Sequence, residues 1–356
     1  MKILYAIQGT GNGHITRAIE ILPHLMKKHR VDILVSGSHW EIKLPYPVRY
    51  RMKGMGFVFG KKGGVDVLRT FLDLNTRNLI REISSLPVRE YDMVISDFEP
   101  VSVWACRKAG KASVGLSNQA AVLHPLAPKP DYTDPFGVSV IKYYAKATHN
   151  YGFHFKALDS TVFTPVIRKN IRESSVSNKG HITVYLPSFE DERIIRRLNH
   201  IKSHPFQVFS KRAKSSYRQG NFNVFPLNEE HFIKSMSSAE GVITQAGFGT
   251  TSEALYLGKK LLVIPMKKQF EQHCNAAMLE SMGVTVAAKL KKKTSHLISD
   301  WIDHGKPCEV DYPDQTASML DMILEKHQQS VAESPFHDIG WDETIERIFL
   351  PPYHWS

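Results

Sequence analysis

The run that decides the fold is Ile243-Thr-Gln-Ala-Gly-Phe-Gly-Thr-Thr-Ser-Glu-Ala-Leu-Tyr-Leu-Gly258. An apolar strand, Gly241–Gln245, leads into the glycine pair Gly247 and Gly249, and a helix-forming segment follows from Thr250. Glycines at such a turn let the backbone approach a ligand closely, and the free N–H groups at a helix start favour an anion. The run therefore predicts a strand–turn–helix unit with an anion site at the turn.

Thr250 and Glu253 allow two interpretations of the same unit. Their spacing is that of a capping box, in which Glu253 is an N-cap partner and has no other role. A capping box does not account for the two glycines that precede it. A phosphate on the helix N-terminus would use those glycines for close approach. We expect the anion site and leave the role of Glu253 open.

Strands and helices alternate on both sides of this unit. The apolar strands are expected at Lys2–Ile7, Val31–Ser36, Met93–Ser96, Ala112–Leu116, His181–Leu186, Phe206–Ser210, Phe222–Phe225 and Leu261–Pro265. Short apolar strands separated by helical segments are typical of parallel βαβ units. We therefore predict an α/β fold with two Rossmann-like, doubly wound domains that face each other across a cleft.

Length and a change of composition set the predicted domain boundaries. A chain of 356 residues is long enough for two domains of similar size. Between Thr164 and Gly180 the composition shifts to Pro, Lys, Arg, Asn and Ser. We predict a first domain over residues 1–165, a linker over 166–180 and a second domain over 181–335. A helical tail, residues 336–356, is expected to return to the first domain.

Charge and cysteine content narrow the class of protein. The net charge of +11 favours anionic partners. The sequence has no nucleic-acid motif, so phosphorylated ligands or a membrane surface are the expected partners and nucleic acid is not. The three cysteines form no C-x-x-C pair, and no apolar run is long enough to span a bilayer. We expect a cytoplasmic protein, with a peripheral position at the inner face of the membrane as an open alternative.

A second glycine-rich turn, Gly9-Thr-Gly-Asn-Gly13, follows the first strand and opens a helix. Its spacing differs from the G-x-G-x-x-G of nicotinamide dinucleotide sites. The next strand ends in Ser36-Gly37-Ser38 and not in an acidic residue that could hold a ribose. A dinucleotide cofactor is therefore disfavoured, and the turn is either structural or binds a ligand.

The fold-deciding run continues through Leu262-Val-Ile-Pro265 to Glu271-Gln-His-Cys-Asn-Ala276. As a whole it resembles the donor signature of GT-B glycosyltransferases. It is similar to the lipid-linked-sugar transferase of peptidoglycan assembly, to glycolipid synthases and to small-molecule UDP-sugar transferases. The loop of Gly11, Asn12 and Gly13 before His14 resembles the acceptor-side loop of the same enzymes. The resemblance implies the GT-B fold, with the acceptor in the first domain and the nucleotide sugar in the second.

The resemblance also implies roles for single residues on the donor side. It implies diphosphate contacts by Gly247, Gly249, Thr250 and Thr251, a ribose contact by Glu253, and contacts to the donor sugar by Glu271 and Gln272. Gln245 stands where many relatives have a His that contacts the diphosphate, and a Gln cannot carry that charge. Lys211 and Arg212 are candidates to supply it, and a solvated loop is the alternative for both.

Glycosyl transfer needs a base that takes the proton of the acceptor. His14 follows a strand and begins a helix, facing the predicted cleft, and the resemblance implies that it is this base. Asp97, after the strand Met93–Ser96, has the placement to orient it. Asp97 could instead bind the acceptor or cap the following helix, and Glu99 is a rival base. Glu99 is otherwise grouped with the acceptor or phosphate loop.

These residues imply one reaction and leave two alternatives open. The reaction is an inverting transfer of a hexose or N-acetylhexosamine from a nucleotide diphosphate sugar, with UDP expected, to an acceptor hydroxyl. We expect no cofactor and no metal, because no Asp-x-Asp cluster stands in a suitable place. The alternatives are an epimerase or hydrolase of the same fold and a non-catalytic protein that binds sugar nucleotides.

The acceptor itself is unknown from the sequence. Six basic residues between Arg49 and Arg69 alternate with Met and Phe. In relatives with lipid-linked acceptors such a patch contacts the membrane, where each cation contributes roughly 1 kcal/mol. The alternative is an acceptor loop with its aromatic residues in the core. A lipid-linked acceptor, and with it a role in cell-envelope or glycolipid biosynthesis, therefore stays an expectation.

Overall fold

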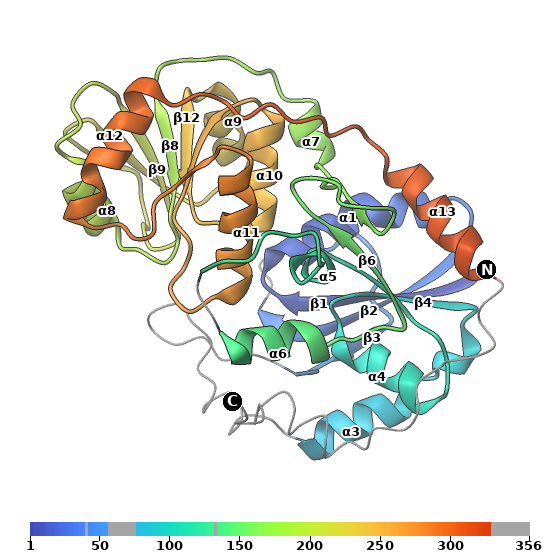
Figure 1. Ribbon diagram of the computed structural model, residues 1–356. Helices are drawn as coiled ribbons and strands as arrows, with labels where there is room; N and C mark the ends of the chain where they lie inside the picture. Colours follow the sequence, from blue (N-terminus) through green and yellow to red (C-terminus); the bar gives the residue numbers. More distant parts are fainter. Residues whose placement is uncertain (40–41, 56–75, 132–133, 329–356) are drawn as a thin grey trace, which may run out of the picture.

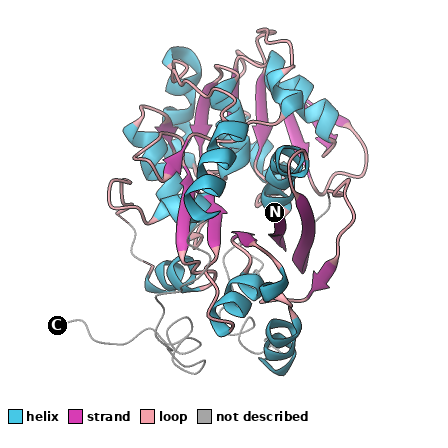
Figure 2. Cartoon of the chain, turned by 90° about the vertical axis from the view of Figure 1, so that its right-hand side faces the viewer, coloured by secondary structure: helices cyan, strands magenta, loops and turns pink. Residues whose placement is uncertain are grey.

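The computed structural model describes residues 1–39, 42–55, 76–131 and 134–328. It contains two seven-stranded sheets, each with helices on both faces (Figures 1 and 2). The strands of the first sheet lie in the order β3-β2-β1-β4-β5-β6-β7 and are all parallel. The second sheet has the order β10-β11-β9-β8-β12-β13-β14, and only β10 is antiparallel to its neighbour. The predicted α/β fold is confirmed.

The strands of the first sheet are β1 (Lys2–Thr10), β2 (Arg30–His39), β3 (Tyr50–Met52), β4 (Met93–Asp97), β5 (Val114–Ser117), β6 (His149–Phe153) and β7 (Val162–Phe163). Its described helices are α1 (Asn12–Met26), α3 (Thr76–Ser85), α4 (Pro100–Lys108), α5 (Asn118–Val122) and α6 (Pro135–Tyr143). Side chains of β1 alternate between two cores. Ile3 and Tyr5 pack toward α1, whereas Leu4 packs toward α3 and α4. Both faces are covered, which explains the uninterrupted apolar run of this strand.

The strands of the second sheet are β8 (Ile182–Tyr185), β9 (Phe206–Ser210), β10 (Tyr217–Gln219), β11 (Phe222–Pro226), β12 (Gly241–Thr244), β13 (Lys260–Val263) and β14 (Thr285–Val286). Its helices are α7 (Lys169–Arg172), α8 (Asp191–Leu198), α9 (Glu229–Ser238), α10 (Phe248–Tyr256), α11 (Phe270–Ser281) and α12 (Ser295–His304). Val242 packs toward α9, α10 and α11, and its neighbour Ile243 packs toward α8 and α12. Each strand predicted from the sequence is present in one of the two sheets, with ends that shift by a few residues.

Helix α13 (Thr316–Gln328) returns to the first sheet, as Figure 1 shows. Met319, Leu320 and Ile323 belong to the core formed by β1 and α1. At the surface, the Lys28 ammonium lies 2.8 Å from an oxygen of Asp321. Helix α13 therefore packs against the first sheet. The predicted boundaries, in contrast, assign residues 181–335 to the second domain. The boundaries themselves stay a prediction.

Two predicted features lie outside the described residues. They are the helical tail at 336–356 and most of the basic region, residues 56–75. Among the residues that are described, no helix has the length and apolar character needed to cross a bilayer.

Candidate active site

The first half of the site is built where β1 turns into α1. Gly11 is the N-cap of α1 and has a φ of 97°, a backbone conformation in which a side chain would be strained. The tight turn places Gly13 and His14 in the first turn of the helix. The His14 side chain is almost buried, with 9% of the residue exposed.

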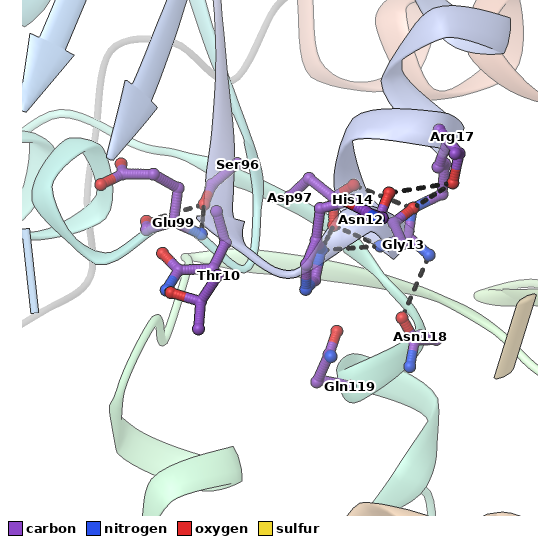
Figure 3. A network of polar contacts seen from close by, with 12 residues as sticks. Thr10, Asn12, Gly13, His14, Arg17, Ser96, Asp97, Glu99, Asn118 and Gln119 are labelled. Carbon is purple, nitrogen blue, oxygen red and sulfur yellow. Dashed lines mark hydrogen bonds and ion pairs between the residues drawn. The ribbon is translucent and has the colours of Figure 1, made fainter. Parts of the chain in front are cut away.

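His14 meets Asp97, which is the last residue of the neighbouring strand β4. The His14 Nδ1 lies 2.8 Å from Oδ1 of Asp97, and the carboxylate is completely buried (Figure 3). The parallel pairing of β1 and β4 brings the two together, because Ile7 is in register with Asp97. The predicted His–Asp pair therefore exists as a direct contact, and its role in catalysis stays a prediction.

Arg17, which the sequence analysis missed, completes this cluster. Its Nε donates to Oδ2 of Asp97 at 2.8 Å and its Nη2 to Oδ1 at 2.5 Å. Nη1 donates to the side-chain oxygen of Asn118 at 3.0 Å. Burial by itself raises the pKa of the Asp97 carboxyl, but the Arg17 guanidinium and His14 outweigh it and hold the pKa below its usual value. The available signal was the spacing, since Arg17 lies three residues after His14 on one helix face.

Glu99 has a structural role in this loop. Its oxygens accept the backbone N–H groups of Val101 at 2.8 Å and Ser102 at 2.7 Å, so Glu99 is the N-cap of α4. It is completely buried, and burial raises the pKa of its carboxyl. Between Asp97 and Glu99, Phe98 has a φ of 53°, which is rare for a residue with a side chain. The alternative of Asp97 as the cap of this helix is therefore wrong, because Glu99 is the cap. The alternative of Glu99 as base stays a prediction.

The second half of the site is the turn from β12 to α10. Gly247 is the N-cap, the helix begins at Phe248, and no side chain of the described residues caps it. The capping box of Thr250 and Glu253 is therefore absent, because Thr250 already lies inside the helix. The hydroxyl of Thr251 donates to the Gly247 carbonyl at 2.5 Å, so it faces the backbone of its own helix. The space where Gly247 and Gly249 would carry a Cβ is open.

Glu253 is paired with Arg168, a residue of the predicted linker. The guanidinium donates from Nε to Oε1 at 2.5 Å and from Nη2 to Oε2 at 2.7 Å. Arg168 also pairs with Glu229 at 2.5 Å. Glu253 is only 6% exposed, and its buried charge is balanced by the Arg168 guanidinium. The linker composition gave no signal for this contact, because 85 residues separate the partners.

Glu271 at the start of α11 joins the two halves of the site. Its Oε1 accepts a hydrogen bond from the Asn118 amide at 2.8 Å, and its Oε2 accepts one from Gln119 at 3.1 Å. Figure 3 shows Asn118 and Gln119 opposite the loop that carries His14. Gln272, predicted beside Glu271 as a sugar contact, is buried, and its oxygen accepts the Met266 N–H at 2.9 Å.

A cavity of about 210 Å³ lies between the two helix starts. It is lined by Thr10, Gly13, His14, Thr16, Arg17, Asn118, Gln119, Val166, Arg168, Phe248, Gly249, Ser252, Glu253, Gln269 and Glu271. Residues of both glycine-rich turns therefore share one space, as the predicted cleft requires.

Gln245, Lys211 and Arg212 do not line this cavity. The Gln245 amide donates to the hydroxyl of Ser188. Arg212 pairs with Glu190 at 2.9 Å and lines a separate cavity of about 560 Å³ on the second sheet. Lys211 is exposed on the same loop. Within the described part of the chain, no group of three or more His, Cys, Asp or Glu residues is arranged to hold a metal.

The sequence model of a protein family, described as glycosyl transferase family 1, matches residues 1–304 of this chain. The chain belongs to glycosyl transferase family 1. The prediction of a glycosyltransferase is thereby confirmed. Among curated proteins, no match to the chain was found.

Solved structures show the fold of this glycosyl transferase family 1 member. The glycotransferase of kitacinnamycin is 12% identical, with 98% of both chains covered and a TM-score of 0.57. MurG of Acinetobacter baumannii is 15% identical over 91% of this chain and 99% of its own, with a TM-score of 0.52. UGT2 of Phytolacca americana, solved with UDP-2fluoro-glucose and pterostilbene, is 14% identical over 93% and 94%, with a TM-score of 0.56. The predicted GT-B fold is confirmed.

Proposed function

We propose that this glycosyltransferase moves a hexose or N-acetylhexosamine from a nucleotide diphosphate sugar, with UDP as the nucleotide, to an acceptor hydroxyl. The transfer inverts the anomeric carbon and needs no metal. One observation carries the proposal: His14, held by Asp97, and Gly249, at the start of α10, line the same cavity. A base and an anion site on opposite sides of one space are what a single displacement requires.

The base in this mechanism is Nε2 of His14. The Asp97 carboxylate only accepts hydrogen bonds, so Nδ1 carries the hydrogen between His14 and Asp97, and Nε2 keeps a free electron pair. Nε2 takes the proton of the acceptor hydroxyl while the hydroxyl oxygen forms a bond to the anomeric carbon. The bond from that carbon to the β-phosphate oxygen breaks, and its electron pair leaves with the diphosphate. Attack from the side opposite the leaving group inverts the carbon.

The start of α10 stabilises the departing diphosphate. The first N–H groups of a helix have no partner within it, and the helix dipole adds about half a positive charge there. In the part of the chain that the structure describes, no side chain caps α10, and the space in front of Gly247 and Gly249 is open. Both features support a diphosphate at this position, with its charge held by the backbone.

The rest of the donor extends to two carboxylates. Glu253 accepts the ribose hydroxyls and Glu271 the hydroxyls of the sugar, as the resemblance implies. Support for UDP comes from the neighbour solved with UDP-2fluoro-glucose. The cavity of about 210 Å³ is smaller than the roughly 300–1,000 Å³ of typical ligand pockets. This cavity therefore has room for only part of the donor.

We also propose the division of labour between the domains. Residues 1–165 bind the acceptor, residues 181–335 bind the donor, and 166–180 link them. A lipid-linked acceptor and contact with the inner face of a membrane belong to this proposal and depend on the basic region that begins at Arg49.

The deciding experiment incubates the protein with a panel of nucleotide sugars. A ligand at 100 times its dissociation constant stabilises the native state by about 2.7 kcal/mol, which a thermal shift detects. We expect UDP-sugars to give the largest shift. With an acceptor, NMR of the product should show the anomer opposite to that of the donor, and the rate should survive EDTA. Rapid epimer formation, or stoichiometric hydrolysis without acceptor, would favour the epimerase or hydrolase alternative.

A further inference from the structure

A second cavity, of about 200 Å³, lies in the first half of the chain beside the cleft. Its lining comprises Ser96, Phe98, Gly115, Ser117, Gln119, Ala120, Leu123, Ile141, Lys142, Ala145, Lys146 and Asn150. Gln119 lines this cavity and the cleft cavity alike. The ring of Phe98 lies parallel to the His14 ring, with the centroids 6.4 Å apart. The cavity therefore lies next to the proposed base.

One polar group in this cavity has no partner in the described part of the chain. The Gln119 side chain is 6% exposed, and its Nε2 donates to Glu271, but its Oε1 accepts no hydrogen bond. Buried polar groups are almost always satisfied in folded proteins, and an exception calls for a ligand or water. A carbonyl oxygen accepts, so a ligand that satisfies Gln119 must carry an O–H or N–H donor.

The charge at the rim of the cavity is positive. Lys142 is exposed in the last turn of α6, and Lys146 follows it. Their ammonium groups lie 5.3 Å and 6.0 Å from the centre of the Tyr143 ring. Among the described residues that line the cavity, none is acidic. Two ammonium groups act as point charges, and lysine in this role is a common binder of phosphate.

We propose that this cavity is the acceptor subsite and that the acceptor is a hydroxyl compound that carries a phosphate. The phosphate lies at Lys142 and Lys146, a ligand hydroxyl donates to Oε1 of Gln119, and the reacting hydroxyl faces His14. This inference rests on the proposed function, to which it adds the chemical class of the acceptor. The phosphate belongs either to a small soluble molecule or to the headgroup of a lipid.

The test measures binding of glycerol 3-phosphate to the full chain by calorimetry, with saturating UDP present to occupy the donor site. Glycerol is the uncharged control. A parallel arm measures binding to vesicles of phosphatidylglycerol, with phosphatidylcholine vesicles as the reference. We expect glycerol 3-phosphate to bind at least about tenfold more tightly than glycerol, or vesicles of phosphatidylglycerol to bind at least about tenfold more tightly than vesicles of phosphatidylcholine, whose phosphate is neutralised by the choline of the same headgroup.

The double variant Lys142→Gln/Lys146→Gln should lower the affinity for the phosphate probe that binds, glycerol 3-phosphate or phosphatidylglycerol vesicles, at least about tenfold. The matched variant Lys234→Gln/Lys306→Gln, which removes two exposed lysines of the second half, should not change it. Gln119→Met should weaken the binding of glycerol 3-phosphate, whose hydroxyl groups can donate to Gln119, and should leave the affinity for UDP unchanged. Binding in the glycerol 3-phosphate arm identifies a soluble acceptor, and binding in the vesicle arm alone identifies a lipid.

Equal affinity of the Lys142/Lys146 variant and the wild type, or no phosphate-dependent binding in either arm, would overturn the inference. The UDP titration of the wild type is read separately. If UDP fails to bind while glycerol 3-phosphate binds through these lysines, the proposed function fails and the phosphate subsite stands. If UDP binds and neither phosphate probe does, only the subsite fails.

Discussion

Arg17 donates to both carboxylate oxygens of Asp97, from Nε at 2.8 Å and from Nη2 at 2.5 Å. The same Nη2 lies 3.0 Å from the Nδ1 of His14. The three side chains are therefore one unit at the junction of β1, α1 and β4. Asp97 is held from two directions, and His14 depends on it for its orientation. Arg17 is a positioning residue in this arrangement.

Replacement of Arg17 by Lys keeps the charge but removes the planar fork. We expect kcat to fall about tenfold to a hundredfold, because small misplacements of a base are costly, while the KM for the donor changes little. Arg17→Met leaves the buried Asp97 carboxylate without its cation and should lower the free energy of unfolding by roughly 3–5 kcal/mol in urea denaturation. A lysine variant with wild-type kcat would rule out the positioning role.

His14→Gln tests the base directly. The variant keeps a polar side chain but has no group that takes a proton, so kcat should fall by about 10² to 10⁴. Affinity for UDP, measured by calorimetry, should stay within about twofold, because diphosphate binding is assigned to α10. His24→Gln on the same helix is the matched control and should retain full activity. Normal turnover of the His14 variant would show that another group is the base.

Glu271→Gln separates the sugar end of the donor from the nucleotide end. The variant loses the charge at the proposed sugar contact and weakens the hydrogen bonds from Asn118 and Gln119. We expect the KM for the UDP-sugar to rise about tenfold, since hydrogen bonds to a charged group contribute roughly 1.5–3 kcal/mol. Binding of UDP alone should be unchanged. Glu280→Gln, an exposed position of the same helix, is the control, and an equal loss of UDP affinity would contradict the assignment.

Arg168→Met leaves the Glu253 carboxylate at 6% exposure without its cation. We expect a loss of roughly 3 kcal/mol in the free energy of unfolding, together with weaker UDP binding. The double variant Arg168→Met/Glu253→Gln should be more stable than Arg168→Met alone, because the unpaired charge is gone. Additive losses in this double-mutant cycle would show that the two side chains do not interact.

His154, directly after β6, should make stability depend on pH. It is 1% exposed, and burial, together with nearby Lys129 and His124, lowers its pKa to about 4. In the unfolded chain the pKa is about 6.5, so between these values the unfolded state binds more protons than the native state. This contribution is complete above pH 6.5 and is lost as the pH falls toward 4, by roughly 3 kcal/mol.

His154→Asn removes that titration and keeps an acceptor for the Phe155 N–H, which now bonds to the ring nitrogen at 3.0 Å. Urea denaturation at pH 7 and pH 4 should therefore show a smaller acid loss for the variant than for the wild type. Equal losses in the two proteins would mean that His154 is already accessible to protons in the native state.

The residues at strand ends show how far sequence reasoning reaches. The pair of His14 and Asp97 is implied by the resemblance to GT-B transferases, and the placement of both residues after buried strands supports it, because such ends meet at one edge of a parallel sheet. The turn at Gly247 is predictable because an apolar strand, a glycine pair and a helix-forming segment follow one another in the sequence. The role of Arg17 was missed because a basic residue on a helix is normally exposed to solvent. Its residue type alone does not predict the buried ion pair with Asp97. The contact of Arg168 with Glu253 was missed because it depends on where the linker passes.

By itself, the sequence determined the α/β architecture, the strand–turn–helix unit that begins at Ile243 and the membership of one enzyme family. These properties follow from hydrophobic periodicity and from glycine, which act over short distances along the chain. Tertiary structure alone decided that Glu253 pairs with Arg168 and that Glu271 reaches Asn118 and Gln119. Such contacts depend on how two sheets pack, because burial forces each charge to find a partner wherever the fold brings one close.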